Sequence, residues 1–284
     1  MDGLLIINKE ANMTSRDVVN IVCKKLNTKK VGHTGTLDPL AAGVLVVAVG
    51  KALKIVEEIT SLEKEYIAKV TLGVETDTLD ITGNVLRESN DFNIEEKDII
   101  RVLNSFKGSY EMEVPKYSAI KVNGKKLYEY ARNNEEVTLP KKNVYINDIE
   151  LLEYDKNSFV FWCNVSKGTY IRSLIRDICK KLNVLGTMSE LTRTKQGIFD
   201  IEDAVLVDDI NSNSKLISMK DALDLPKIEV DEFLYNKIKN GQKLEDKYGQ
   251  DKLCFIYKDE LIAIYVKDIK DESKIKPKKV FITN

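Results

Sequence analysis

The most informative segment of the chain is Gly32-His33-Thr34-Gly35-Thr36-Leu37-Asp38-Pro39-Leu40-Ala41-Ala42-Gly43-Val44-Leu45. Its first part, Gly32–Gly43, is rich in glycine, threonine and proline, which predicts a loop. The next run, Gly43–Gly50, is apolar at consecutive positions, as is typical of a strand buried on both faces. A loop that leads into a central buried strand can hold a polar side chain rigidly at a cleft. This stretch is therefore the first place to look for chemistry.

Asp38 has two interpretations on local grounds. It precedes Pro39, which disfavours a helical backbone at Asp38 and would direct the carboxylate away from a helix cap. In the functional interpretation that carboxylate faces a cleft. In the structural one Asp38 forms an Asx turn, and His33 is a hydrogen-bonded structural residue. The local sequence leaves both open.

The hydrophobic periodicity predicts interspersed strands and helices without strict β-α alternation, which favours an α+β fold with a mixed sheet. Thr14 or Ser15 is expected to cap the first helix, and Asn93 to cap the third with Glu96 in a capping box. Asn123-Gly124 predicts a hairpin turn. The expected strands are Gly3–Asn8, Gly43–Gly50, Tyr66–Val74, Val144–Tyr154 and Ser158–Val165, with loop and strand over Leu185–Phe199; the expected helices are Arg16–Leu26, Lys51–Thr60, Ile94–Phe106, Leu127–Arg132 and Tyr170–Leu182.

A domain boundary is expected near Asn211–Leu225, where the chain becomes polar and irregular before Pro226. We therefore predict a catalytic domain over residues 1–225 and a small module over residues 226–284. The module contains a helix, a turn at Asn240-Gly241 and short strands, so it is expected to be rich in β structure.

The bulk composition is that of an ordinary globular protein. Hydrophobic residues make up 43% of the 284 residues and charged residues 31%, which does not suit a disordered chain. Four scattered cysteines and a single histidine argue against a zinc site and favour free thiols. The N-terminus does not resemble a signal peptide, and no apolar run approaches the ~20 residues of a membrane span. A cytoplasmic protein is expected.

Positive charge is concentrated in two segments although the formal net charge is −1. Residues 163–197 hold seven Lys/Arg against two acids, and residues 114–142 hold seven against three. Residues 200–260 are acidic, with fifteen Asp/Glu against nine lysines. The basic segments are either a face that binds a polyanion or solvated helix faces, and charge alone does not separate the two.

The string from Gly32 to Leu45 closely resembles the signature loop of the bacterial tRNA pseudouridine synthase B (TruB) family. Further motifs follow in the family's order, and together they cover roughly residues 3–200. They are Gly3–Lys9, Lys64-Glu65-Tyr66 with Gly73, Thr76–Gly83, Val114–Gly124, Tyr128–Arg132, Ser166–Leu174 and Leu191–Thr194.

This resemblance implies an enzyme that isomerises uridine 55 in the T loop of tRNA to pseudouridine. The N1–C1′ bond breaks, the bound uracil turns, and C5 joins C1′. It also implies a mixed, largely antiparallel sheet flanked by helices and loops, followed by a PUA-like RNA-binding module. No cofactor, metal, membrane, guide RNA or obligatory protein partner is expected, and the enzyme is expected to be a monomer.

Site roles follow from the same resemblance. Asp38 matches the nucleophile or essential carboxylate, which can capture or stabilise C1′ or remove a proton at C2′. The sequence leaves open whether Asp38 attacks C1′ or a glycal forms. Arg172 matches the arginine that pairs with this carboxylate and keeps it ionised. Tyr66 matches a tyrosine that stacks on the base and takes the C5 proton.

Other positions are expected to contact the RNA or the flipped base. Tyr170 matches a second pocket tyrosine, Leu191 an apolar wall under the uracil, and His33 a residue that contacts the flipped nucleotide region. Asp80 matches an RNA contact, and Lys9 and Lys54 lie at family lysine positions. The alternatives are core packing for the aromatic and apolar residues, a phosphate contact for Arg172 and surface charge for the lysines. The basic segments would grip phosphates, and Asn123–Arg132 would form a mobile thumb over the T loop.

Two other function classes stay open at this stage. A non-catalytic RNA-binding protein would have no need of the set Asp38, Tyr66 and Arg172. A related synthase working within a guide-RNA complex is the second, and the absence of basic tails favours the stand-alone form. A glycoside hydrolase would need paired carboxylates.

Overall fold

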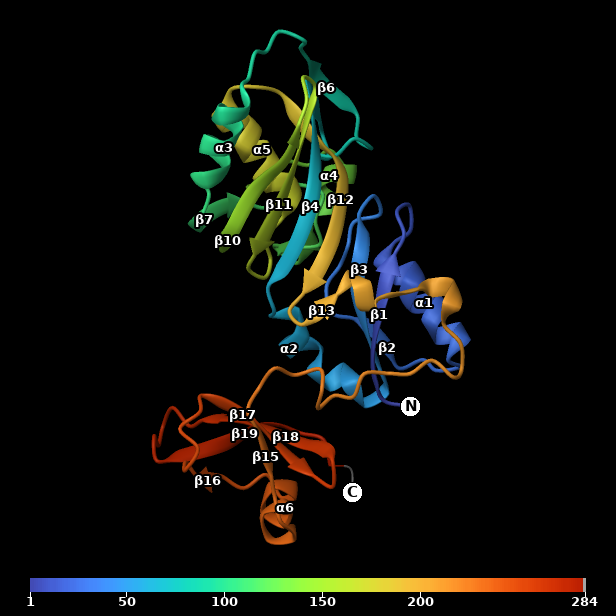
Figure 1. Cartoon of the computed structure of the whole chain (residues 1–284), viewed down its shortest axis with the longest axis vertical. Coiled ribbons are helices and arrows are strands. Elements are labelled where there is room, and N and C mark those ends of the chain that lie inside the picture. The colour runs from blue at the N-terminus through green and yellow to red at the C-terminus, as the bar shows by residue number, and fades with distance from the viewer. Residues whose placement is uncertain (283–284) are drawn as a thin grey trace.

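The computed structural model describes residues 1–282 as a large α+β part and a small sheet at one end of the long axis (Figure 1). Within these residues the large part is built on one ten-stranded sheet in the order β14-β1-β3-β12-β4-β11-β10-β7, with β2 beside β3 and β13 beside β12. Two pairs, β1 with β14 and β12 with β3, are parallel, and the others are antiparallel. The expected mixed, largely antiparallel sheet is confirmed.

The bounds of the elements in the large part are as follows. The sheet strands are β1 (Gly3–Lys9), β2 (Val31–His33), β3 (Ala42–Val49), β4 (Lys64–Leu72), β7 (Gly108–Glu113), β10 (Lys141–Tyr154), β11 (Ser158–Val165), β12 (Gly186–Gln196), β13 (Phe199–Asp200) and β14 (Val205–Leu206). Two hairpins pair β5 (Val74–Thr76) with β6 (Val85–Glu88) and β8 (Lys121–Val122) with β9 (Lys125–Lys126). The helices are α1 (Ser15–Lys25), η1 (Gly50–Ile55), α2 (Val56–Thr60), α3 (Glu96–Asn104), α4 (Leu127–Arg132), α5 (Ile171–Leu182), η2 (Ile201–Asp203) and η3 (Val207–Asp209).

In the centre of the sheet, the loop that precedes β3 and carries Asp38 lies beside β12. Strand β3 is buried along most of its length, as its apolar run predicted. It pairs with β12 only at its beginning, where Thr192 lies opposite Ala42 and Arg193 opposite Gly43. Gly43 has a φ of +97°, and a Cβ at this position would lie 2.2 Å from the Arg193 carbonyl oxygen. Only glycine lets these two backbones approach so closely.

Three local predictions differ from the structure around β3. The expected loop Gly32–Gly43 begins later, because Val31–His33 forms β2 and covers the edge of β3 that β12 leaves unpaired. Most of Leu185–Phe199 is the long strand β12, which pairs along β4. The expected helix Lys51–Thr60 is divided into a 3-10 turn, η1, and the short α2.

Of the two predicted helix caps, the first is confirmed and the prediction of the second is wrong. Thr14 caps α1 in a capping box with Asp17. In α3 the N-cap is Glu95 rather than Asn93, without a side-chain hydrogen bond. Ile94 is buried, and its carbonyl accepts a hydrogen bond from the Tyr154 hydroxyl, so core packing holds this residue outside the helix.

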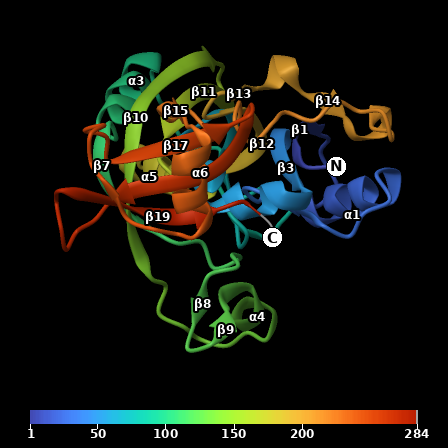
Figure 2. The ribbon, with the colours of Figure 1, turned by 90° about the horizontal axis from the view of Figure 1, so that it is seen from below.

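The turn predicted at Asn123-Gly124 is confirmed, since both residues have positive φ between β8 and β9. This hairpin and α4 stand apart from the main sheet when the molecule is seen from below (Figure 2). Residues 1–282 contain no helix with the length and hydropathy of a membrane span.

The C-terminal part forms a second, five-stranded sheet in the order β15-β17-β18-β19-β16, compatible with a PUA-like module. Buried residues of this sheet, such as Cys254 and Ile264, share one hydrophobic cluster with Leu4 and Val46 of the large part. The boundary between residues 225 and 226 stays a prediction, and residues 283–284 lie outside the described residues. The elements are β15 (Lys227–Glu229), α6 (Glu232–Lys239), β16 (Leu244–Glu245), β17 (Lys252–Tyr257), β18 (Glu260–Lys267) and β19 (Lys274–Val280).

Candidate active site

A cavity of about 370 Å³ lies between the Gly35–Asp38 loop, strands β4 and β12, and the beginning of α5. Part of its wall comes from Tyr117–Ala119, which precedes the β8-β9 hairpin. Five residues singled out from the sequence line this cavity together: Asp38, Tyr66, Tyr170, Arg172 and Leu191.

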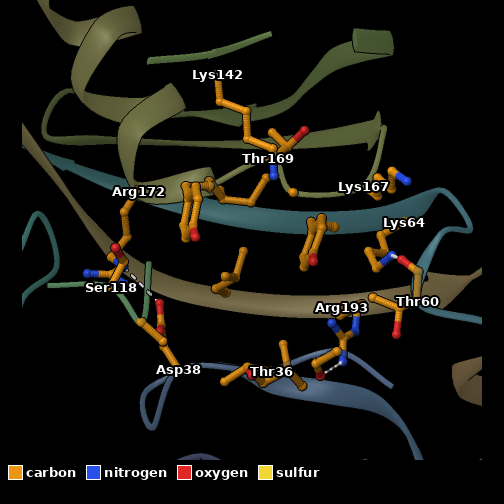
Figure 3. A pocket seen from close by; sticks show the side chains of 18 of the residues that line it. Thr36, Asp38, Thr60, Lys64, Ser118, Lys142, Lys167, Thr169, Arg172 and Arg193 are labelled. Atoms are coloured by element: carbon orange, nitrogen blue, oxygen red, sulfur yellow. Dashed lines mark hydrogen bonds and ion pairs between the residues drawn. The ribbon is translucent and has the colours of Figure 1, made fainter. Parts of the chain in front are cut away.

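Asp38 and Arg172 form an ion pair at one end of the cavity (Figure 3). Arg172 Nε lies 2.8 Å from Asp38 Oδ2. The other guanidinium nitrogens donate to backbone carbonyls, Nη1 to Thr78 at 2.9 Å and Nη2 to Tyr117 at 3.1 Å. The arginine side chain is only 6% exposed, whereas the aspartate side chain is 36% exposed. The guanidinium is therefore fixed, and the carboxylate it holds is open to a ligand.

The backbone around Asp38 is anchored from α1 and β1. The Ser15 hydroxyl accepts from the Leu37 amide at 2.9 Å and donates to the Leu37 carbonyl at 3.1 Å. The buried Lys9 ammonium donates to the carbonyls of Met13 at 2.7 Å and Pro39 at 3.3 Å. Burial lowers the pKa of Lys9 to about 8, although the charge of Asp38 opposes this effect. These contacts hold the backbone on both sides of Asp38, and neither Ser15 nor Lys9 lines the cavity.

Tyr66 and Leu191 supply apolar walls from neighbouring strands. Both are 7% exposed, and both line the cavity, Tyr66 from β4 and Leu191 from β12. Tyr170 directly precedes α5, and burial raises the pKa of its hydroxyl. A flat ring could be enclosed between such aromatic and aliphatic side chains.

Four positions proposed from the sequence lie outside the cavity lining of the described residues: Lys9, Lys54, Asp80 and His33. Lys9 is the buried anchor described above, and Lys54 is exposed on η1. The Asp80 carboxylate accepts from the Thr78 hydroxyl and from the amide and hydroxyl of Thr82, at 2.5 to 3.0 Å. These contacts give Asp80 a structural task within its loop. Its predicted contact with RNA stays a prediction.

His33 lies on β2 and is half-buried. Its Nδ1 has no hydrogen-bond partner within residues 1–282. Burial lowers the pKa of this histidine, and the nearby charges of Arg16 and Arg193 lower it further. A neutral imidazole is therefore favoured, and its predicted contact with the flipped nucleotide stays a prediction.

Sequence reasoning did not single out two cations that line the cavity, Lys64 and Arg193. The alternation of strand side chains could have found them, because Lys64 is two residues from Tyr66 and Arg193 two residues from Leu191. Across the strands Arg193 lies opposite Tyr66. No group of three or more His, Cys, Asp or Glu side chains in the described part of the chain is arranged to hold a metal ion.

Comparison with known proteins shows which family this chain resembles. Residues 23–171 match the model of the TruB family pseudouridylate synthase N-terminal domain. The tRNA pseudouridine synthase B of Caldanaerobacter subterraneus subsp. tengcongensis is 42% identical, covering 99% of both chains. That of Clostridium tetani is 43% identical, covering 94% of this chain and 93% of its own. Among solved structures, a chain of a Cbf5-Nop10-Gar1 complex has a TM-score of 0.76 and 26% identity, covering 99% of this chain and 85% of that one.

Proposed function

This chain belongs to the TruB family of pseudouridylate synthases, and from that membership we propose that it converts uridine 55 in the T loop of tRNA to pseudouridine. The observation that carries the proposal is the Asp38–Arg172 pair at the end of a cavity walled by Tyr66 and Leu191. The names of the relatives, which align over nearly the whole chain, support tRNA as the substrate.

The target base is stacked within a folded loop, so it has to turn out of the RNA to enter the cavity. In this proposal the uracil lies between Tyr66 and Leu191 with its ribose beside Asp38. The carboxylate either captures C1′ as the N1–C1′ bond breaks or removes the proton at C2′. Arg172 keeps the carboxylate ionised and aimed at the sugar. The freed uracil turns, C5 bonds to C1′, and Tyr66 takes the C5 proton.

The RNA backbone would be held outside the cavity by exposed lysines. Lys142 and Lys167 are exposed and line the cavity mouth, where phosphates of an entering nucleotide pass. The β8-β9 hairpin and α4 would cover the T loop. Their tyrosines are already engaged: Tyr130 donates to the Val122 carbonyl at 3.0 Å, and Lys126 and Arg132 lie over the Tyr128 ring. This supports internal packing as the main task of these rings.

We also propose that the enzyme acts as a monomer in the cytoplasm, without cofactor, metal or guide RNA. The alternative is a related synthase that works within a guide-RNA complex, and the likeness to a chain of a Cbf5-Nop10-Gar1 complex bears on it only by showing a relative within a protein complex. Identity of 42–43% to proteins named tRNA pseudouridine synthase B, against 26% to the chain of a Cbf5-Nop10-Gar1 complex, favours the stand-alone form.

The proposal is tested with a T-arm hairpin carrying tritium at C5 of its uridines. The purified chain is expected to release tritium from the hairpin without any added cofactor or RNA. A matched hairpin in which cytidine replaces the target uridine should release no tritium. If the enzyme were inert on both the hairpin and full-length tRNA, the proposed substrate would be wrong.

A further inference from the structure

Two buried cations lie at the end of the cavity away from Asp38, and they are not used in the mechanism above (Figure 3). Arg193 is 1% exposed and Lys64 is 7% exposed. Within residues 1–282 no carboxylate lies within salt-bridge distance of either side chain. Burying unpaired charge is costly. A pair of like charges kept in this way is therefore suited to a negative charge that arrives only with the ligand.

Backbone carbonyls fix both cations but do not use all their donors. The Lys64 ammonium donates to Thr60 at 3.0 Å and Leu62 at 2.6 Å, which leaves one N–H. In Arg193, Nε donates to Val44 at 2.6 Å and Nη2 to Gly35 at 3.1 Å. Its Nη1 makes no hydrogen bond among the described residues.

Both side chains approach Gly35. A Cβ built on this glycine would lie 3.4 Å from Arg193 Nη1, 3.6 Å from Gln196 Oε1 and 3.8 Å from Lys64 Cε. Burial lowers the pKa of Lys64 to about 8, and the charges of Arg193 and Lys167 contribute further. The two cations therefore form one positively charged corner of the cavity.

The strand register places this corner next to the proposed base site. Arg193 lies opposite Tyr66 across the β12-β4 pair, and Lys64 and Tyr66 share a face of β4. A uracil held beside Tyr66 with its ribose at Asp38 would extend toward Lys64 and Arg193. Its carbonyl edge is the part that would reach them.

We propose that Lys64 and Arg193 stabilise the negative charge of the uracil when it is detached from the ribose. This inference rests on the proposed function. When the N1–C1′ bond breaks, its electron pair leaves with N1 and is delocalised onto O2 and O4. The same anion forms whether Asp38 captures C1′ or removes the C2′ proton. The pair is used when C5 forms its bond to C1′, while either the Asp38–C1′ bond breaks or Asp38 returns the proton to C2′. The C5 proton then leaves, and N1, which was bonded to C1′ in uridine, gains a proton. Fixed positive charge aimed at an anion that forms during the reaction lowers the barrier to forming it.

A backbone phosphate is the other anion to consider. Phosphates stay near solvent, and the exposed Lys142 and Lys167 at the cavity mouth suit them. Arg193 and Lys64 are too deeply buried for a phosphodiester to reach without its own desolvation cost. The two possibilities differ in what they predict for rate and for affinity.

The test compares leaving groups within each variant. Lys64→Met removes the charge, and Lys64→Arg retains it. Single-turnover cleavage of the N1–C1′ bond is measured on T-arm hairpins with uridine or 5-fluorouridine at the target, together with hairpin affinity. Fluorine stabilises the departing anion by itself, so 5-fluorouridine depends less on the enzyme's cations.

For Lys64→Met we expect cleavage of uridine to slow by about 100-fold and cleavage of 5-fluorouridine by roughly tenfold or less. Hairpin affinity should change by less than about threefold, because phosphate contacts supply most of it. Lys64→Arg should retain more of the uridine rate than Lys64→Met. Lys142→Met is the matched control. It should bind the hairpin more weakly and with a smaller salt dependence, and its effect on the cleavage rate should be the same for uridine and 5-fluorouridine.

Equal slowing on both bases, an unchanged rate, or a loss confined to affinity would overturn the inference. If Lys64→Met does not unfold cooperatively, Arg193→Lys takes its place, because this variant keeps the positive charge but displaces it. The same ratio of uridine to 5-fluorouridine cleavage rates then decides the outcome. A wild-type chain that cleaves neither hairpin would refute the proposed function instead. A wild-type chain that is active, with variants indifferent to fluorine, would refute only this inference.

Discussion

Arg172 joins three segments of the chain at Asp38: its Nε contacts Asp38 Oδ2 at 2.8 Å, while its Nη1 and Nη2 bind the carbonyls of Thr78 and Tyr117. The guanidinium is therefore both the partner of the carboxylate and a brace between the loops on either side of the cavity. This double task predicts different consequences for changes at the two residues.

Asp38→Asn should abolish turnover while leaving RNA binding largely intact. The amide has nearly the same shape but can neither capture C1′ nor remove a proton, so tritium release should fall by about 1,000-fold or more. Hairpin affinity, measured by filter binding, should stay within about threefold. The exposed Asp209→Asn is the matched control and should behave as wild type. Near-normal turnover in Asp38→Asn would contradict the assigned chemistry.

Arg172→Lys should impair both activity and stability. A lysine has one nitrogen and cannot serve three acceptors in the arginine's planar geometry, so buried carbonyls lose their donors. Each unsatisfied group costs about 1–3 kcal/mol, which urea unfolding would detect. Arg176→Lys, one turn along α5, alters the half-buried contacts with Glu113 and Asp177 and should retain tritium release. Equal activity losses in the two variants would argue against a specific partnership with Asp38.

Activity should decline at alkaline pH as Lys64 loses its proton. Burial lowers its pKa to about 8, and the charged side chains that face it, Arg193 and Lys167, lower it further. Because the protonated form is the useful one, kcat/KM should fall as pH rises through about 8. In Lys64→Arg this fall should move to higher pH, since arginine stays protonated. A fall at the same pH in that variant would assign it to another group, of which Lys9 is the first candidate.

Ser15→Ala should loosen the loop that carries Asp38 without touching the ligand. The Ser15 hydroxyl is buried and holds both the amide and the carbonyl of Leu37, next to Asp38. Its loss should lower the free energy of unfolding by about 1–3 kcal/mol. The rate should drop roughly tenfold at saturating RNA, because the carboxylate is held less accurately. Ser214→Ala, in a surface turn, is the control, and a purely structural role would lower stability but leave kcat unchanged.

The contact between the large part and the C-terminal sheet should depend on Glu58 of α2. This buried carboxylate pairs with Lys252 and Lys278 of the C-terminal sheet. Both lysines are partly exposed, so Glu58→Gln should cost about 2 kcal/mol, less than a fully buried pair. The neighbouring Glu57→Gln, whose side chain is 76% exposed, should cost little. Calorimetry distinguishes the outcomes, and equal melting temperatures for Glu58→Gln and wild type would show that this pair does not hold the sheets together.

The sequence alone was enough to predict most of the local elements and to indicate Asp38 as the candidate carboxylate. The apolar run after Gly43 defines a buried strand, Asn123-Gly124 a hairpin turn, and the string around Asp38 a family. Each is encoded over a few neighbouring residues, through side-chain alternation, backbone sterics or a recognisable motif. The prediction of the Asn93 cap failed because the contact of Ile94 with Tyr154 is not local.

The folded chain added residues to the cavity wall that no local pattern indicated. The strand order β3-β12-β4 places Arg193 opposite Tyr66 and beside the loop of Asp38, although these residues are far apart in the chain. It also made Lys9 a buried support and Lys64 a member of the cavity wall. Strand order and burial depend on which distant faces pack together, and local residue spacing does not encode that pairing.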